Sequence, residues 1–208
     1  MVVSECLTYT FPNGIRLIHQ ASDGPVGYMG IILNTGSRDE TEEEHGIAHF
    51  IEHCIFKGTK TRKAYHVLSR MEDVGGELNA YTTKEETALY ATFLSEYYPR
   101  AAELLSDILF NSTFPEKELK REKEVIFEEM NSFKDSPSEL IFDEFDELVF
   151  DGHPIARNIL GTFKSINEML SAKADLVQHW LKPYGPSPSL PLCPIVEPVA
   201  FLNCNHYL

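Results

Sequence analysis

The 208-residue sequence predicts an α+β fold, in which an antiparallel or mixed sheet is covered by helices mainly on one face. An Asn-Gly pair near the N-terminus separates two strand-like segments, which is typical of a β-hairpin. Further along the chain, segments with helical periodicity occur in pairs between strand-like segments. Hydrophobic residues make up 43% of the chain, which is ample for a core in a domain of this length.

Five segments have the pattern of strands. They are residues 7–11, 15–20, 26–34, 77–83 and 87–94. Pro12-Asn13-Gly14 forms the turn of the hairpin between the first two, and Thr35-Gly36-Ser37 breaks the third. The last two segments alternate between apolar and polar residues, as expected of strands with one buried face.

Five further segments are predicted to be helices. They are residues 41–56, 63–74, 96–109, 115–133 and 136–149. Thr41 is expected to cap the first helix, since three glutamates follow it in a first turn that favours negative charge. Gly75-Gly76 ends the second helix, and Pro115 suits the start of the fourth.

The chain divides into one domain, residues 1–182, and a different tail, residues 183–208. Six of the twelve prolines lie in the tail, where Glu197 is the only Asp, Glu, Lys or Arg. Proline interrupts helices and cannot donate to a sheet ladder. We therefore expect an irregular tail without a long helix or a central strand, either a linker, a truncated end or non-native sequence.

The net charge of −14 argues against nucleic acid and anionic membranes as partners. Residues 135–151 carry seven acids and no Lys or Arg, which we interpret as a solvated helix face, with binding of basic peptides as the alternative. The four cysteines form no CxxC pair, and the sequence has no apolar run near the ~18–20 residues of a membrane span. The first residues also lack the features of a secretory signal, so we expect a cytoplasmic protein.

The most informative pattern is His49-Phe50-Ile51-Glu52-His53, within the first predicted helix. Two histidines four residues apart lie one turn apart on one face, so both imidazoles can bind one Zn²⁺. Glu52 is then close enough to take a proton from metal-bound water as a general base. The alternative is a helix with two surface histidines and a solvated glutamate. His45 is interpreted as a structural histidine, and Cys54 as a core residue.

This HxxEH pattern resembles the inverzincin signature of the pitrilysin/insulinase/mitochondrial-processing-peptidase family of zinc metallopeptidases. The flanking segments Gly46-Ile47-Ala48 and Phe56-Lys57-Gly58-Thr59 are similar to the family as well. The resemblance implies that residues 1–182 are the N-terminal, zinc-binding half of a clam-shell peptidase. The implied activity is hydrolysis of peptide bonds in extended peptides.

The resemblance also implies a third ligand to the single Zn²⁺, a glutamate about 75 residues after the motif. Glu129 lies 76 positions after His53 and matches, although spacing alone does not distinguish it from Glu128. Glu122, two helical turns before Glu129, is implied to be a carboxylate that supports catalysis near the site; the alternative is a surface glutamate paired with Lys or Arg.

In the family, the segment Gly75–Thr82 is an edge strand to which the substrate adds as a further strand. Asn79, Ala80 and Tyr81 are therefore implied to bind substrate. A second, similar half closes the chamber in the family, so we expect a partner half or self-association. The alternative function is a non-catalytic or incomplete binding or assembly subunit. Residues 153–161 resemble a loop of bacterial members, without an assigned chemistry.

Overall fold

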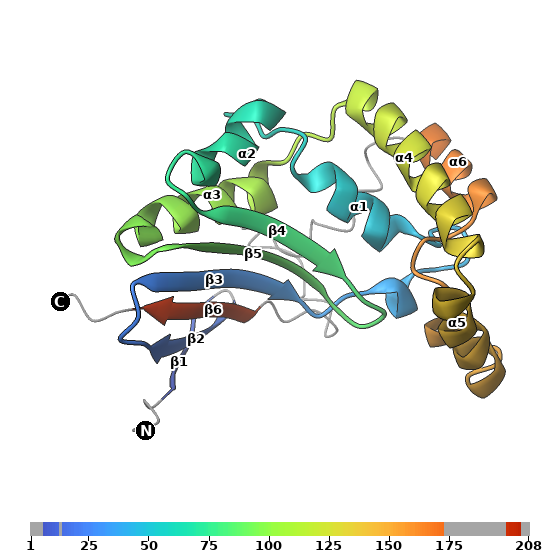
Figure 1. Ribbon diagram of the computed structural model, residues 1–208, viewed down its shortest axis with the longest axis horizontal. Coiled ribbons are helices and arrows are strands. Elements are labelled where there is room, and N and C mark those ends of the chain that lie inside the picture. The colour runs from blue at the N-terminus through green and yellow to red at the C-terminus, as the bar shows by residue number, and fades with distance from the viewer. Residues whose placement is uncertain (1–5, 13, 173–198, 205–208) are drawn as a thin grey trace.

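The computed structural model describes residues 6–12, 14–172 and 199–204, which form one mixed sheet with helices around it (Figure 1). Within these ranges the strand order is β1-β2-β6-β3-β5-β4, and only β2 and β6 pair in parallel. The strands are β1 (Leu7–Thr10), β2 (Arg16–Ala21), β3 (Val26–Leu33), β4 (Glu77–Thr82), β5 (Thr87–Leu94) and β6 (Val199–Cys204). The predicted α+β class, with a mixed sheet, is confirmed.

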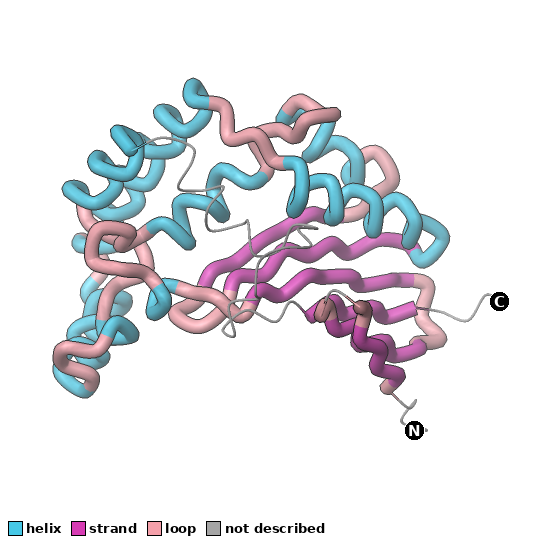
Figure 2. Tube along the Cα trace, turned by 180° about the vertical axis from the view of Figure 1, so that it is seen from behind, coloured by secondary structure: helices cyan, strands magenta, loops and turns pink. Residues whose placement is uncertain are grey.

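The helices form two groups. They are α1 (Ile47–Ile55), α2 (Ala64–Glu72), α3 (Tyr98–Asn111), α4 (Glu116–Lys134), α5 (Pro137–Val149) and α6 (Phe163–Ala172). The first three contact the sheet, whereas α4 and α6 pack on α1, and α5 packs on α4. Figure 2 shows the second group beyond the end of the sheet. None of the helices in the described ranges is both long and apolar enough to cross a membrane.

Two apolar clusters hold these layers together, and α1 lies between them. One lies between the sheet and helices α2 and α3, and includes Phe93, Met71 and Leu104. The other joins α1 to α4 and α6, and includes Phe50 and Ile126. Because α1 is covered on the sheet side and on the α4 side, seven of its nine residues are buried. Its polar side chains are therefore held in place by packing from both layers.

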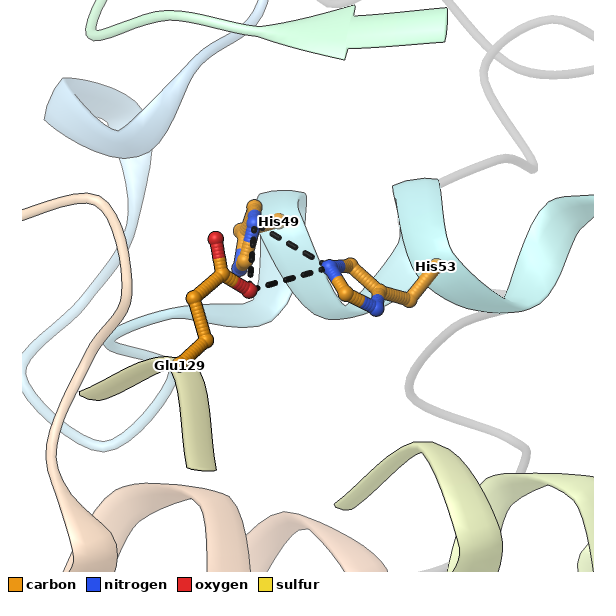
Figure 3. Close-up of side chains that lie close together, drawn as sticks. All are labelled: His49, His53 and Glu129. Carbon is orange, nitrogen blue, oxygen red and sulfur yellow. Dashed lines mark hydrogen bonds and ion pairs between the residues drawn. The ribbon is translucent and has the colours of Figure 1, made fainter. Parts of the chain in front are cut away.

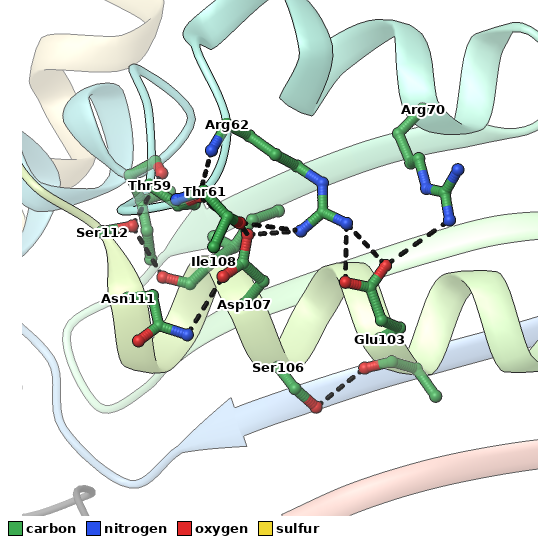
Figure 4. A network of polar contacts seen from close by, with 12 residues as sticks. Thr59, Thr61, Arg62, Arg70, Glu103, Ser106, Asp107, Ile108, Asn111 and Ser112 are labelled. Atoms are coloured by element: carbon green, nitrogen blue, oxygen red, sulfur yellow. Dashed lines mark hydrogen bonds and ion pairs between the residues drawn. The ribbon is translucent and has the colours of Figure 1, made fainter.

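The chain that leaves α1 is tied to α3 by a buried carboxylate (Figure 4). Asp107 accepts hydrogen bonds from Thr59 Oγ1 at 2.7 Å, Thr61 Oγ1 at 2.9 Å and Asn111 Nδ2 at 3.0 Å, and pairs with Arg62. Burial acts to raise the pKa of Asp107, but these hydrogen bonds lower it overall. The network anchors the C-terminal side of α1 to α3.

Helix α1 begins later than predicted. Thr41 does not cap it: the cap residue is Gly46, with φ of 95°, and the first turn contains no acidic residue. A left-handed cap conformation suits glycine and interrupts the helix at this residue, so the glutamates after Thr41 lie before the helix. The short helix α6 was not predicted, although Thr162 Oγ1 accepts a hydrogen bond from Ser165 N at its start, as in an N-cap.

The expectation that the tail contributes no central strand is wrong for Val199–Cys204. This segment is β6, which lies between β2 and β3 in the middle of the sheet. All six prolines of the tail precede it in the sequence, so each of its residues has an N–H to donate. The rest of the tail, residues 183–198 and 205–208, lies outside the described residues.

Candidate metal centre

Two imidazoles and one carboxylate converge beside α1 (Figure 3). His49 and His53 lie one turn apart on α1, and Glu129 reaches them from α4, which packs against α1. The distances are 3.3 Å between the two Nε2 atoms, 3.4 Å from His53 Nε2 to Glu129 Oε2, and 3.8 Å from His49 Nε2 to the same oxygen.

These distances fit a zinc ion. Zn²⁺ binds His nitrogen and carboxylate oxygen at ~2.0–2.2 Å in tetrahedral geometry, which places its ligand atoms about 3.3–3.6 Å apart. The three measured distances lie in or close to this range. Nitrogen and carboxylate oxygen are also the donors that zinc accepts. The three side chains can therefore hold zinc with little movement.

The electrostatic environment keeps the His49 imidazole neutral. Burial, and to a smaller extent the neighbouring His53, lowers the pKa of His49 to about 4. Only 6% of His49 is exposed. A neutral imidazole offers the lone pair that a metal needs, so the nitrogen does not have to lose a proton near pH 7. The Glu129 side chain, at 45% exposure, leaves the site open to solvent on one side.

Glu122 joins this group from the same helix as Glu129. Its Oε2 atom lies 3.4 Å from His53 Nδ1, and its Oε1 atom lies 2.8 Å from Lys57 Nζ. A carboxylate at Nδ1 places the proton on that nitrogen and leaves Nε2 free to bind a metal. The alternative, a surface glutamate paired with a lysine, accounts for the contact with Lys57 but not for the contact with His53. Lys57 itself was not predicted, although it belongs to the flanking segment noted in the sequence.

Glu52 lies outside the converging three but close to them. Burial raises the pKa of its carboxyl group, while the neighbouring Thr82 and His53 act in the opposite direction and Glu129 reinforces the increase. Thr82 is the last residue of β4. Glu52 is thus located between the candidate metal ligands and the end of that strand.

The strand β4 is the edge of the sheet, next to α1. Its outer edge pairs with no strand among the described residues. Asn79 and Tyr81 point to the exposed face, whereas Ala80 is half-buried against the helices. Tyr81 donates its hydroxyl to Glu86 Oε1 at 2.8 Å, which fixes the ring beside the edge.

The two remaining residues near the motif have structural surroundings. His45 Nε2 lies 2.6 Å from the carbonyl oxygen of Asn158, in the segment before α6. Cys54 is 1% exposed in the cluster between α1 and α4, and burial raises the pKa of its thiol. Both observations agree with the predicted structural and core positions.

The sequence matches the family model described as Insulinase (Peptidase family M16) over residues 17–163. This match covers more than half of the chain and includes every residue of the candidate centre. The chain belongs to the insulinase family.

Relatives within the family support the same assignment. A Bacillus subtilis protein named uncharacterized zinc protease YmxG is 36% identical over 177 residues, which cover 85% of this chain and 42% of that protein. The rat mitochondrial-processing peptidase subunit beta is 37% identical over 177 residues, covering 85% of this chain and 36% of that protein. The bovine cytochrome b-c1 complex subunit 1 is 32% identical over 182 residues, covering 88% and 38%. The chain thus spans about two fifths of the length of these relatives.

Solved structures share the insulinase-family fold. A protease from Helicobacter pylori superposes with a TM-score of 0.85 at 21% identity, covering 99% of this chain and 47% of that chain. Pitrilysin superposes with a TM-score of 0.76 at 21% identity, covering 99% and 21%. At this identity the similarity concerns the fold alone. The present chain corresponds to about half of the first structure and about a fifth of the second.

Proposed function

We propose that this chain is the zinc-binding N-terminal half of a metalloendopeptidase that hydrolyses peptide bonds in extended peptides. The observation that carries the proposal is the triangle of ligand atoms from His49, His53 and Glu129, because its sides suit tetrahedral zinc. Three protein ligands leave a fourth position for water or substrate, as in catalytic rather than structural zinc sites. We expect one Zn²⁺ per chain.

Bound zinc supplies activation of a water molecule and of the scissile carbonyl group. Glu52 accepts the proton as the water oxygen bonds to the carbonyl carbon, and donates it to the amine nitrogen as the C–N bond breaks. Burial raises the pKa of Glu52 above its ordinary value, which makes its carboxylate a stronger base. Glu122 holds the proton at Nδ1 of His53 and so keeps the other nitrogen directed at the metal.

The substrate binds along the unpaired edge of strand β4. An extended peptide adds to the unpaired edge through main-chain hydrogen bonds, so many sequences are accepted. Asn79, Ala80 and Tyr81 lie along this edge, which ends beside Glu52 at Thr82. A second, homologous half or subunit closes over the peptide and contributes the opposite wall of the chamber.

A binding or assembly subunit is the second candidate. It is favoured by one observation, the 32% identity to a subunit named for the cytochrome b-c1 complex rather than for a peptidase. A purely assembling subunit has no need of the Glu52 carboxyl group beside the converging ligands. The two functions therefore differ in what a substitution of Glu52 does.

The test compares Glu52→Gln with the exposed control Glu43→Gln, each as the 208-residue chain supplied with a matching C-terminal half. For the base assignment, we expect Glu52→Gln to retain zinc by elemental analysis and to lose turnover of a peptide by about 10²–10⁴-fold. Glu43→Gln should change neither. Loss of zinc in Glu52→Gln makes Glu52 a ligand and contradicts the mechanism. A zinc-replete wild type without turnover favours the assembly subunit.

A further inference from the structure

The cap residue of helix α1 lies only three residues before His49, and it has no side chain that could accept a hydrogen bond from the first turn. The first four N–H groups of a helix have no partner within it, and the first turn frays unless other groups accept those hydrogen bonds. The cap residue is Gly46, so His49 is the third residue of α1 and lies in this first turn, while His53 lies one turn further in. The distance between the two imidazoles therefore depends on how the first turn is held.

A buried carboxyl group from outside the helix holds it. Glu40 Oε2 accepts a hydrogen bond from Gly46 N at 2.7 Å, and Glu40 Oε1 accepts one from Ala48 N at 2.9 Å. Glu40 is only 3% exposed. Two of the unpaired donors are thus satisfied by one side chain, and the second of them belongs to the residue directly before His49.

Arg157, before α6, and Ser165, in the first turn of α6, hold this arrangement from the other side. Arg157 donates from its guanidinium to the carbonyl oxygen of Glu40, and Ser165 Oγ donates to the carbonyl oxygen of His45 at 2.6 Å. The backbones of Gly46 and Gly161 touch: a Cβ atom on Gly46 would lie 2.8 Å from the Gly161 Cα atom. Arg157, Gly161 and Ser165 thus pack on the start of α1, and the first two belong to the segment 153–161, to which the sequence assigned no chemistry.

We propose that Glu40, held by Arg157, is a positioning residue for the metal centre, which fixes the first turn of α1 and thereby sets His49 against His53. The inference rests on the proposed function, because it assumes that these histidines bind a metal. The Glu40 side chain accepts hydrogen bonds from the backbone of Gly46 and Ala48, so it acts on the proposed metal ligands through the backbone of α1. A carboxyl group used only for stability would not alter the geometry at the metal.

The experiment measures zinc affinity by chelator competition, and the visible spectrum of the Co²⁺-substituted protein, which reports the ligand arrangement. Glu40→Gln keeps the size but only one acceptor oxygen, and turns an amide nitrogen toward a backbone N–H. We expect about a 10-fold weaker zinc affinity, the range seen when groups that orient ligands are removed, and an altered Co²⁺ spectrum. Glu40→Ala should have a larger effect, because it removes both acceptors.

The matched control is Asp107→Asn, at another buried acidic side chain with several hydrogen bonds, which anchors the other end of α1 to α3. It should lower the free energy of unfolding while leaving the zinc affinity within twofold and the Co²⁺ spectrum unchanged. If Glu40→Gln and Glu40→Ala do not fold, Arg157→Gln leaves the cap in place but removes its anchor, and a several-fold loss of zinc affinity is expected.

Two results overturn the inference. The first is a folded Glu40 variant whose zinc affinity and Co²⁺ spectrum match those of the wild type. The second is an equal change of zinc affinity in Glu40→Gln and Asp107→Asn. For Arg157→Gln, an affinity within twofold of the wild type also overturns it. His49→Ala in the same series tests the proposed function separately. If the wild type and His49→Ala bind zinc equally, the metal site itself is wrong, whatever the Glu40 variants do.

Discussion

At the residue scale, the geometry of the candidate centre shows which of two neighbouring glutamates lies close to the histidines, a choice that sequence spacing leaves open. Glu128 and Glu129 lie in the same turn of α4, and the structure brings Glu129 to the histidines. Glu129→Gln should lower zinc affinity strongly, because an amide oxygen is a weaker, uncharged ligand, whereas Glu128→Gln should leave it unchanged. Elemental analysis after dialysis measures the difference. Equal retention of zinc by both variants contradicts the ligand assignment.

The carboxyl group of Glu122 supports a second prediction at this scale. It lies between His53 Nδ1 and Lys57 Nζ, so Glu122→Gln exchanges a carboxylate for an amide at the orienting position. We expect zinc affinity to fall by about 10–100-fold without loss of the fold. Glu124→Gln, an exposed acid on the same helix, is the control. Competition with a chromophoric chelator gives both dissociation constants, and identical values would assign Glu122 to a surface ion pair.

At the scale of the element, the cap of α1 gives stability a pH dependence. Burial raises the pKa of Glu40 to about 8; its hydrogen bonds to Gly46 and Ala48 and the charge of Arg157 lower it, and Glu44 raises it. The folded protein then keeps a proton that the unfolded chain releases above its ordinary pKa of 4.5. The unfolded state binds fewer protons in this window, so the free energy of unfolding falls as pH rises from about 4.5 to 8.

Glu40→Gln should remove this part of the pH dependence, since an amide does not titrate. Urea unfolding at pH 5, 7 and 9 measures it: wild type should lose more stability with rising pH than the variant, by up to about 1.4 kcal/mol per pH unit within the window. The exposed control Glu43→Gln should keep the wild-type slope. Parallel pH profiles for wild type and Glu40→Gln would contradict the raised pKa.

At the scale of the whole molecule, the helix α5 exposes its apolar side. Six large apolar residues on or beside it are at least 43% exposed, whereas Asp143 and Asp146 turn inward and pair with Lys84. Five of the seven acids in residues 135–151 are exposed, as predicted, but two pair with Lys84, and exposed apolar residues lie beside the acids on this surface. The exposed residues are Ile141, Phe142, Phe145, Leu148, Val149 and Phe150.

Such a surface predicts self-association of the chain on its own. Substituting Phe142 and Leu148, which are 71% and 81% exposed, with serine should shift the chain toward monomer in sedimentation velocity experiments. Serine at Tyr65, 74% exposed on α2, should not. An unchanged association state in the α5 variant would place the contact elsewhere.

The open metal centre leads to a prediction at the same scale. The proposed ligands, the proposed base Glu52 and the edge strand all lie in this chain. Solvent reaches Glu129, however, and water weakens the electrostatic stabilisation of a developing oxyanion. The chain alone should bind zinc yet cleave peptides poorly. Adding a matching C-terminal half in trans should raise kcat/KM substantially, through positioning and exclusion of water. Equal rates for the chain, confirmed as a monomer, and for the mixture would show that no second half is needed.

Local patterns determined much of this protein. Sequence patterns identified five strands to within two residues of their observed ends, and five of the six α-helices in the part of the chain that the structure describes. The pair of His49 and His53, with Glu52 between them, follows from helix geometry alone, because residues four apart share a face. The length and the 43% of hydrophobic residues were enough to predict a core, and Cys54 was correctly predicted to lie in it.

Other features depend on contacts between residues distant in sequence, and only the tertiary structure decided them. Spacing alone left Glu128 and Glu129 open, the family resemblance selected Glu129, and the packing of α4 on α1 brings Glu129 to the histidines. The cap of α1 comes from Glu40, six residues before Gly46, rather than from Thr41. Val199–Cys204 became a central strand because β2 and β3 offer two open edges, although the prolines before it suggested otherwise. Local propensity reports the conformation that a segment prefers by itself, whereas these outcomes depend on hydrogen-bond partners that folding brings from elsewhere in the chain.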